Sequence, residues 1–244
     1  MNTLIRFFQE GGTFMYPIAV VLVVGLAIAI ERWMFLSMAK RSNRQAFDRI
    51  LPLLQKRDYQ GVMNTGKSTN APIARIVCAG VARMAQSPRR DDIELAMEEG
   101  VMEAMPRLER RTPYLATLAN IATLLGLLGT IMGLIAAFTA VANADPSEKA
   151  ALLSQSISVA MNTTAFGLMA AIPLLLLHTA IQNKTAEIVD SLEMAGVKTL
   201  NIMSNSDAFS AKTRATDPAT AAAAAGIAII APQIALKAAI NRKA

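Results

Sequence analysis

The stretch TPYLATLANIATLLGLLGTIMGLIAAFTAVANA, residues 112–144, carries no formal charge over 33 consecutive positions. A second stretch, AALLSQSISVAMNTTAFGLMAAIPLLLLHTAIQN, occupies residues 150–183 and runs for 34 positions, with neutral His178 as its only titratable side chain. A third uncharged stretch covers the 20 residues 11–30. A helix rises about 1.5 Å per residue, so roughly 20 mostly apolar residues cross a membrane. The sequence therefore predicts three membrane-spanning helices.

The composition of the whole chain agrees with this prediction. Of its 244 residues, 53% are hydrophobic and 17% are charged, whereas soluble domains carry about 25% charged residues. Cys78 is the only cysteine, which excludes an intrachain disulfide and leaves no Cys/His cluster for zinc. No GxSxG motif, HExxH motif or pair of acids lies in a predicted span. We therefore expect no metal, no cofactor and no enzymatic activity.

The distribution of Lys and Arg predicts the orientation. Fourteen lie in residues 39–112 and seven in 182–244, against one in the first 14 residues and one, Lys149, in 143–151. Basic residues favour the cytoplasmic side, so we expect 39–112 and the C-terminal region to be cytoplasmic. The net charge of +6 then reflects topology, and we expect no nucleic-acid partner.

These observations predict an all-α integral membrane protein with three transmembrane helices and long cytoplasmic helical extensions. We expect the first span to be a true transmembrane helix rather than a signal peptide, with Glu31 and Arg32 at its interfacial end and Trp33 as an aromatic anchor. The predicted segments are a periplasmic N-terminus (1–14), transmembrane helix 1 (15–36), a cytoplasmic helical region (37–112), transmembrane helix 2 (113–142), a periplasmic loop (143–152), transmembrane helix 3 (153–182), a cytoplasmic helical extension (183–206) and an Ala-rich cytoplasmic tail (207–244).

Within the cytoplasmic region, apolar spacing predicts a helix over 46–54, followed by a loosened chain at Asp58, Tyr59 and Gly61. A second helix is expected after Pro72 and a third near Asp91. A helix over 113–142 would be about 45 Å long, against about 30 Å of hydrocarbon. We therefore expect the second and third spans to continue as helices outside the membrane.

Small residues follow one face of each of the later spans. In the second span they are Thr123, Gly126, Thr130, Gly133 and Ala137; Gly129 and Gly133 also form a GxxxG pair. In the third span they are Ser156, Ala160, Thr163, Gly167 and Ala170. Such faces allow close helix packing in lipid. The alternative interpretation is a strip of threonine hydroxyls that lines an interior pathway, and the spacing leaves both open.

Two runs of sequence resemble a known family. LLGLLGTIMGL at 124–134 resembles the second-span signature of the ExbB/TolQ/MotA family of proton-channel subunits. TTAFGLMAAIP at 163–173 looks like that family's third-span signature. The resemblance covers roughly residues 15–204. ExbB and TolQ, which have three spans, match better than MotA, which has four.

The resemblance implies an energy transducer of the bacterial inner membrane. Five such subunits form a ring around the span of an ExbD/TolR-like partner that carries an intramembrane Asp, and proton flow drives a TonB/TolA-like protein. The resemblance assigns Thr130 and Thr164 to the pore, and we place the neighbouring Thr123 and Thr163 on the same strip. The expected helix-packing residues are Gly126, Gly129, Gly133, Gly167 and Pro173. Two positions depart from the family pattern: Val159 stands where a glutamate is common, and His178 where a tyrosine is common.

The chemistry of the spans leads to the same choice. Neither later span contains Asp, Glu, Lys or Arg, and threonine hydroxyls do not titrate near neutral pH. Either the chain conducts no protons, or a partner supplies the carboxylate, as the resemblance implies. A MotA-like motility stator and a non-conducting membrane scaffold remain alternatives. We expect a homo-oligomer in contact with membrane lipid, whose second and third spans line a central pore through their small faces.

Overall fold

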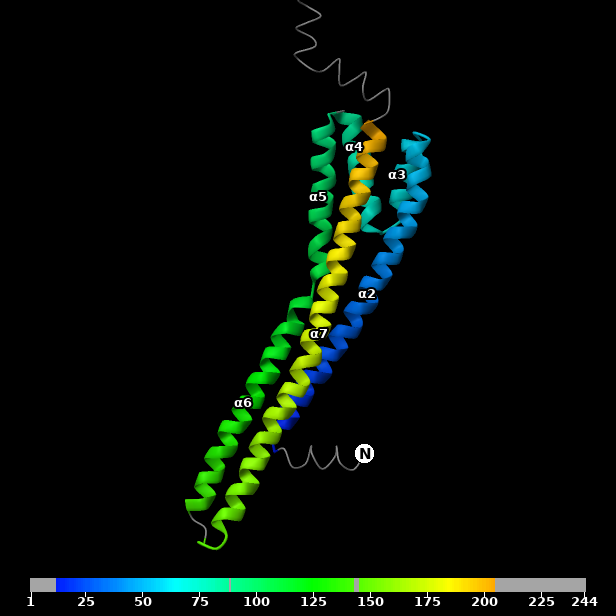
Figure 1. Cartoon of the computed structure of the whole chain (residues 1–244). Helices are drawn as coiled ribbons and strands as arrows, with labels where there is room; N and C mark the ends of the chain where they lie inside the picture. The colour runs from blue at the N-terminus through cyan, green and yellow to red at the C-terminus, as the bar shows by residue number, and fades with distance from the viewer. Residues whose placement is uncertain (1–11, 88, 143–144, 205–244) are drawn as a thin grey trace, which may run out of the picture. The chain divides into compact units, whose positions relative to one another are not determined.

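The computed structural model describes residues 12–87, 89–142 and 145–204, and all regular structure in these ranges is α-helical (Figure 1). Three helical stretches are long and apolar enough to cross a membrane: Met15–Gln55, Arg90–Ala142 and Lys149–Ser204. This confirms the predicted fold class. Most of the predicted N-terminal segment and the whole tail 207–244 lie outside the described residues. The helices are α2 (Met15–Gln55), α3 (Tyr59–Ser68), α4 (Pro72–Gln86), α5 (Arg90–Glu109), α6 (Thr112–Ala142) and α7 (Lys149–Ser204).

The chain forms two compact units. The first comprises the described parts of Met1–Lys40 and Met105–Val189, and the second those of Arg41–Ala104 and Asp190–Ala244. Helices α2, α5 and α7 contribute residues to both units. All three stretches that could cross a membrane thus have parts in the first unit.

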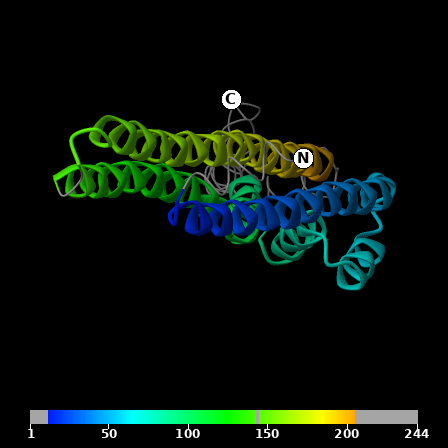
Figure 2. The ribbon, with the colours of Figure 1, turned by 90° about the horizontal axis from the view of Figure 1, so that it is seen from below.

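In the first unit, α6 and the early part of α7 lie side by side (Figures 1 and 2). Small residues fill their contact, while large apolar side chains point outward. The buried small residues are Ala119, Ala122, Gly126, Gly129, Ala160, Gly167 and Ala170. The exposed large ones include Leu124, Leu127, Ile131, Ile135, Phe138, Ile172 and Leu176. An apolar surface of this extent suits lipid or a neighbouring subunit rather than water.

In the second unit, larger apolar side chains form the core. Its fully buried members include Ile50, Leu54, Ile73, Ile76, Ile93 and Leu192. Helices α4 and α5 begin close to the predicted starts, at Pro72 and Arg90. The predicted loosening at Asp58 is confirmed, because α2 ends at Gln55 and α3 begins only at Tyr59, whereas Gly61 lies within α3 rather than in a loosened chain. The Asp58 carboxylate accepts a hydrogen bond from the Gly61 amide at 2.9 Å, which caps and starts α3.

The helical extensions are long, as predicted. Helix α7 has 56 residues and is therefore about 84 Å long, well beyond about 30 Å of hydrocarbon. Helix α2 also continues without interruption to Gln55. The second span was expected to continue as a helix outside the membrane. Instead, a turn that includes Arg111, at a φ of 67°, separates α5 from α6. Pro113 lies in the first turn of α6 and lacks the amide that a continuous helix would need there.

Candidate functional site

Helices α6 and α7 approach each other through glycines. A Cβ on Gly167 would lie 2.8 Å from the Ala122 carbonyl oxygen and 2.9 Å from the Gly126 Cα. A Cβ on Gly133 would lie 2.8 Å from the Ala160 Cβ. Gly129 meets the Thr163 side chain in the same way, with 3.1 Å between the added Cβ and the threonine Cβ. The small faces of the two helices thus meet each other within one chain, which differs from the expectation that these faces line a central pore between copies.

The same contact holds the threonine pair. The Thr130 and Thr164 hydroxyls are hydrogen-bonded to each other. Each is also within hydrogen-bond distance of the Gly126 carbonyl oxygen, at 3.2 Å from Thr130 and 2.9 Å from Thr164. Thr130 therefore reaches a carbonyl of its own helix, four residues back, whereas Thr164 reaches a carbonyl of the neighbouring helix. Both residues are half-buried.

This cluster has fewer hydroxyl hydrogens than hydrogen-bond contacts. Each hydroxyl has one hydrogen to donate and lone pairs to accept, so two hydrogens serve three contacts among Gly126, Thr130 and Thr164. One hydroxyl can turn to donate to a carboxylate, and either can accept from a carboxylic acid. The cluster can thus bind both protonation states of a carboxyl group without titrating itself.

The remaining predicted residues have different surroundings. Thr163 is 2% exposed and donates to the Val159 carbonyl at 3.0 Å, one turn back in its own helix. Thr123 is exposed and donates to the Ala119 carbonyl at 3.1 Å. Pro173 lies inside α7 and precedes Leu174, which is fully buried and packs against Gly25 of α2. The structure brings together Thr130 and Thr164 but leaves Thr123 out of their cluster.

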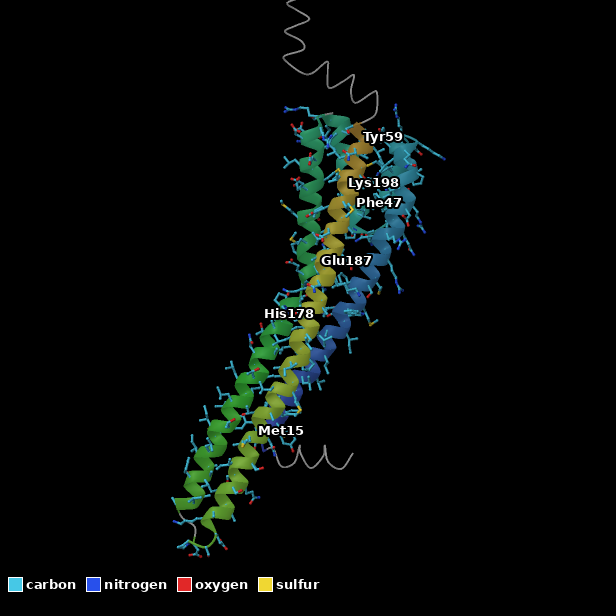
Figure 3. The ribbon with its side chains drawn as sticks, viewed as in Figure 1. Met15, Phe47, Tyr59, His178, Glu187 and Lys198 are labelled. Carbon is cyan, nitrogen blue, oxygen red and sulfur yellow. The ribbon has the colours of Figure 1, made fainter. Side chains whose placement is uncertain are left out.

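His178 and Val159, the two departures from the family pattern, lie on α7 away from any charged partner. His178, labelled on α7 in Figure 3, is half-buried and makes no hydrogen bond or ion pair with another described residue. Val159 is half-buried and its side chain lies close to Gly12, 3.3 Å from where a Cβ there would stand. Neither residue supplies a charge to the threonine cluster.

Arg32 is a polar residue whose surroundings the sequence did not predict. Although it lies at the expected end of the first span, its side chain is 3% exposed. Its guanidinium donates to the Leu108 carbonyl near the end of α5 and lies 4.8 Å from the Phe35 ring centroid. Carbonyls at a helix C-terminus carry partial negative charge, so this contact joins α2 to the α5–α6 turn. A bond across 76 residues of sequence has no local signal.

Further charged groups gather close to Arg32 in the same unit. Arg111 bonds Glu31 at 3.0 Å. The Lys184 Nζ lies 3.9 Å from the Trp33 ring centroid and 2.6 Å from the Ser37 Oγ. These polar contacts lie where the apolar stretches of α2, α6 and α7 stop. Such a boundary is what the edge of a hydrocarbon layer requires.

Comparison with known proteins identifies the family. The model of the MotA/TolQ/ExbB proton channel family matches residues 68–194, more than half of the chain. The chain belongs to this family. The prediction made from the two signature runs is therefore confirmed, and the protein is a membrane protein of a family of proton-channel subunits.

Individual relatives are similar at moderate identity. A putative biopolymer transport protein ExbB homolog from Methanothermobacter thermautotrophicus is 29% identical over 79% of this chain and 68% of its own length. A putative biopolymer transport protein ExbB-like 3 from Synechocystis is 27% identical, over 69% and 80% respectively. The Tol-Pal system protein TolQ of Haemophilus influenzae is 28% identical over 65% of this chain and 73% of its own length.

Proposed function

We propose that the chain forms a homo-oligomeric ring, a pentamer as the resemblance implies, in the bacterial inner membrane. A one-span ExbD/TolR-like partner places an intramembrane aspartate beside Thr130 and Thr164, and proton transfer through it drives a TonB/TolA-like protein. In this proposal 37–112 and the C-terminus are cytoplasmic, while the N-terminus and 143–152 are periplasmic. The names of the relatives support a role in transport or in a Tol-Pal system over a motility role.

The observation that carries the proposal is the cluster of Gly126, Thr130 and Thr164. Its two hydroxyls can serve a carboxyl group in either protonation state, and they lie in spans that contain no carboxylate. An intramembrane ionisable group usually marks a proton relay. Because this chain supplies none in its later spans, a partner's aspartate completes the pathway.

The test is reconstitution with and without the partner. The chain is co-expressed with a one-span membrane protein that has an intramembrane Asp, and native mass spectrometry counts the subunits. In liposomes with an imposed pH gradient, we expect proton uptake when the complex is reconstituted and none when the chain is reconstituted by itself. An Asp→Asn change in the partner should abolish uptake while leaving the complex intact. Equal uptake by the chain alone would contradict the proposal, and no uptake from the intact complex would favour a non-conducting scaffold.

A further inference from the structure

Helix α5 presents an unpartnered acidic face in the second unit. Its inward face buries Ile93 and Met97. On the opposite face Leu95 and Met102 are 63% and 68% exposed. The helix holds seven Asp and Glu residues against two Arg. Exposed acids therefore surround two exposed apolar side chains, among them Asp91, Glu94, Glu98 and Glu99.

Helix α2 presents an unpartnered basic face in the same unit. Its inward side chains from Asn43 to Leu54 are buried at helical spacing, and the opposite side is exposed. That exposed side includes Arg41, Arg44, Gln45, Arg49 and Pro52, with Asp48 as one acid among the three arginines, so its net charge is positive. Within the described ranges, none of these three arginines and none of Glu94, Glu98 and Glu99 forms an ion pair. The two faces have opposite charge and both lack partners.

The two faces lie on opposite sides of the unit, with α4 and α7 between them in Figure 1. Contacts with α4 also place the acidic face and the basic face at similar positions along the length of α4. The Asn43 side chain accepts from the Ile73 amide at 3.3 Å, and a Cβ on Gly100 would lie 3.3 Å from the Ile76 Cα. Because α2 and α5 run in opposite directions past α4, Gln45 is nearly level with Met102.

We propose that the acidic face of α5 in one copy docks on the basic face of α2 in the next copy. The inference rests on the homo-oligomer of the proposed function and adds the surfaces that join its subunits outside the spans. Two different patches on opposite sides of a subunit make a head-to-tail contact, which closes into a ring when the rotation allows it. A rotation preserves height along its axis, so Arg49 of one copy faces Glu98 of the next. Complementary charge of this kind sets register.

Disulfide cross-linking in membranes tests the contact on the full chain. Two differently tagged copies, Gln45→Cys and Met102→Cys, both with Cys78→Ala, are co-expressed and oxidised. We expect a disulfide between the two copies, and none between copies that carry only Met102→Cys. Arg75→Cys, an exposed and nearly level position on α4, serves as the control against Met102→Cys and should not cross-link. Cross-linking of Met102→Cys to itself, or to Arg75→Cys as efficiently as to Gln45→Cys, would overturn the head-to-tail contact.

Charge reversal tests whether the opposite charges of the two faces hold them together, rather than the two cysteines merely lying close to each other. Changing Glu94 and Glu98 to Lys should abolish most of the cross-link because basic faces then oppose each other. Adding Arg44→Glu and Arg49→Glu should restore it. An intact ring by native mass spectrometry without the Gln45–Met102 cross-link would overturn this inference and leave the proposed function standing. The absence of any oligomer would overturn both.

Discussion

The α6–α7 contact of the first unit and the α4–α5 contact of the second unit both contain glycines, but different atoms oppose them. A Cβ on Gly167 of α7 would meet backbone atoms of α6, at 2.8 and 2.9 Å. A Cβ on Gly80 of α4 would meet the Met97 side chain of α5, with 2.8 Å to its sulfur and 2.9 Å to its Cγ. A backbone cannot move without separating the helices, whereas a methionine side chain can turn aside.

The difference reflects what holds each pair together. Between helices in lipid the hydrophobic effect supplies no attraction, so stability comes from close backbone approach and interhelical hydrogen bonds. The α6–α7 pair has both, in Gly167 against Gly126 and in the Thr130–Thr164 cluster. The α4–α5 pair instead buries Ile76, Ile93 and other large apolar side chains, each worth about 1.5–3 kcal/mol when removed from water.

Matched Gly→Ala changes test this comparison and should give the largest difference. Gly167→Ala should separate α6 from α7, with a cost of about 1–3 kcal/mol from overpacking, and it should reduce oligomer assembly. Gly80→Ala should be nearly neutral, because Met97 can move and alanine is favoured in a helix by about 1 kcal/mol. Thermal unfolding in detergent and native mass spectrometry measure both. Equal losses for the two variants would remove the distinction between the contacts.

Two arginines of the first unit allow a buried polar contact to be compared with an exposed one. Arg32→Leu should leave the Leu108 carbonyl without this donor and lower the free energy of unfolding by about 1–3 kcal/mol. Arg111→Gln removes an ion pair whose side chains are 51% and 45% exposed, and should cost at most about 1 kcal/mol. Denaturant unfolding in detergent checks the order. A larger loss for Arg111→Gln would show that the Arg32 contact contributes little to stability.

The sequence predicted the fold well because its main signals are long and local. Three uncharged stretches and apolar spacing were enough for the spans, the start of α4 and the length of α7. It located the break in the chain at Asp58 but failed to predict α3, the helix that the Asp58 carboxylate caps. It also failed for Arg32, because the carbonyl that binds it lies on another helix.

The candidate site could be proposed from the sequence only through the family signature. That signature singled out Thr130 and Thr164 as candidates, and the structure places these two hydroxyls in contact although they are 34 residues apart. Helical periodicity placed Thr123 and Thr163 on the same strips with equal weight. Only the packing of α6 on α7 distinguishes a hydroxyl bonded across helices from one bonded to its own helix.

The orientation of the two units toward the membrane can be tested without changing stability. Ser68 and Ser147 are both exposed. Cysteines at these positions, each with Cys78→Ala, should react oppositely with an impermeant maleimide: position 147 from outside the inner membrane, position 68 only after lysis. Cys78 is replaced even though burial raises the pKa of its thiol and slows its reaction. Labelling of position 68 from outside would reverse the orientation proposed for residues 37–112.

Proton uptake by the reconstituted complex of the Thr130→Val, Thr164→Val variant tests the central claim most directly. Valine keeps the shape of threonine and removes the hydroxyl, and Thr163→Val is the matched control because that hydroxyl bonds to its own helix. We expect the double variant to assemble normally but lose most proton uptake, while Thr163→Val and the double Thr→Ser variant retain most of it. Full uptake by the double valine variant at normal assembly would contradict the account and leave these threonines with packing alone.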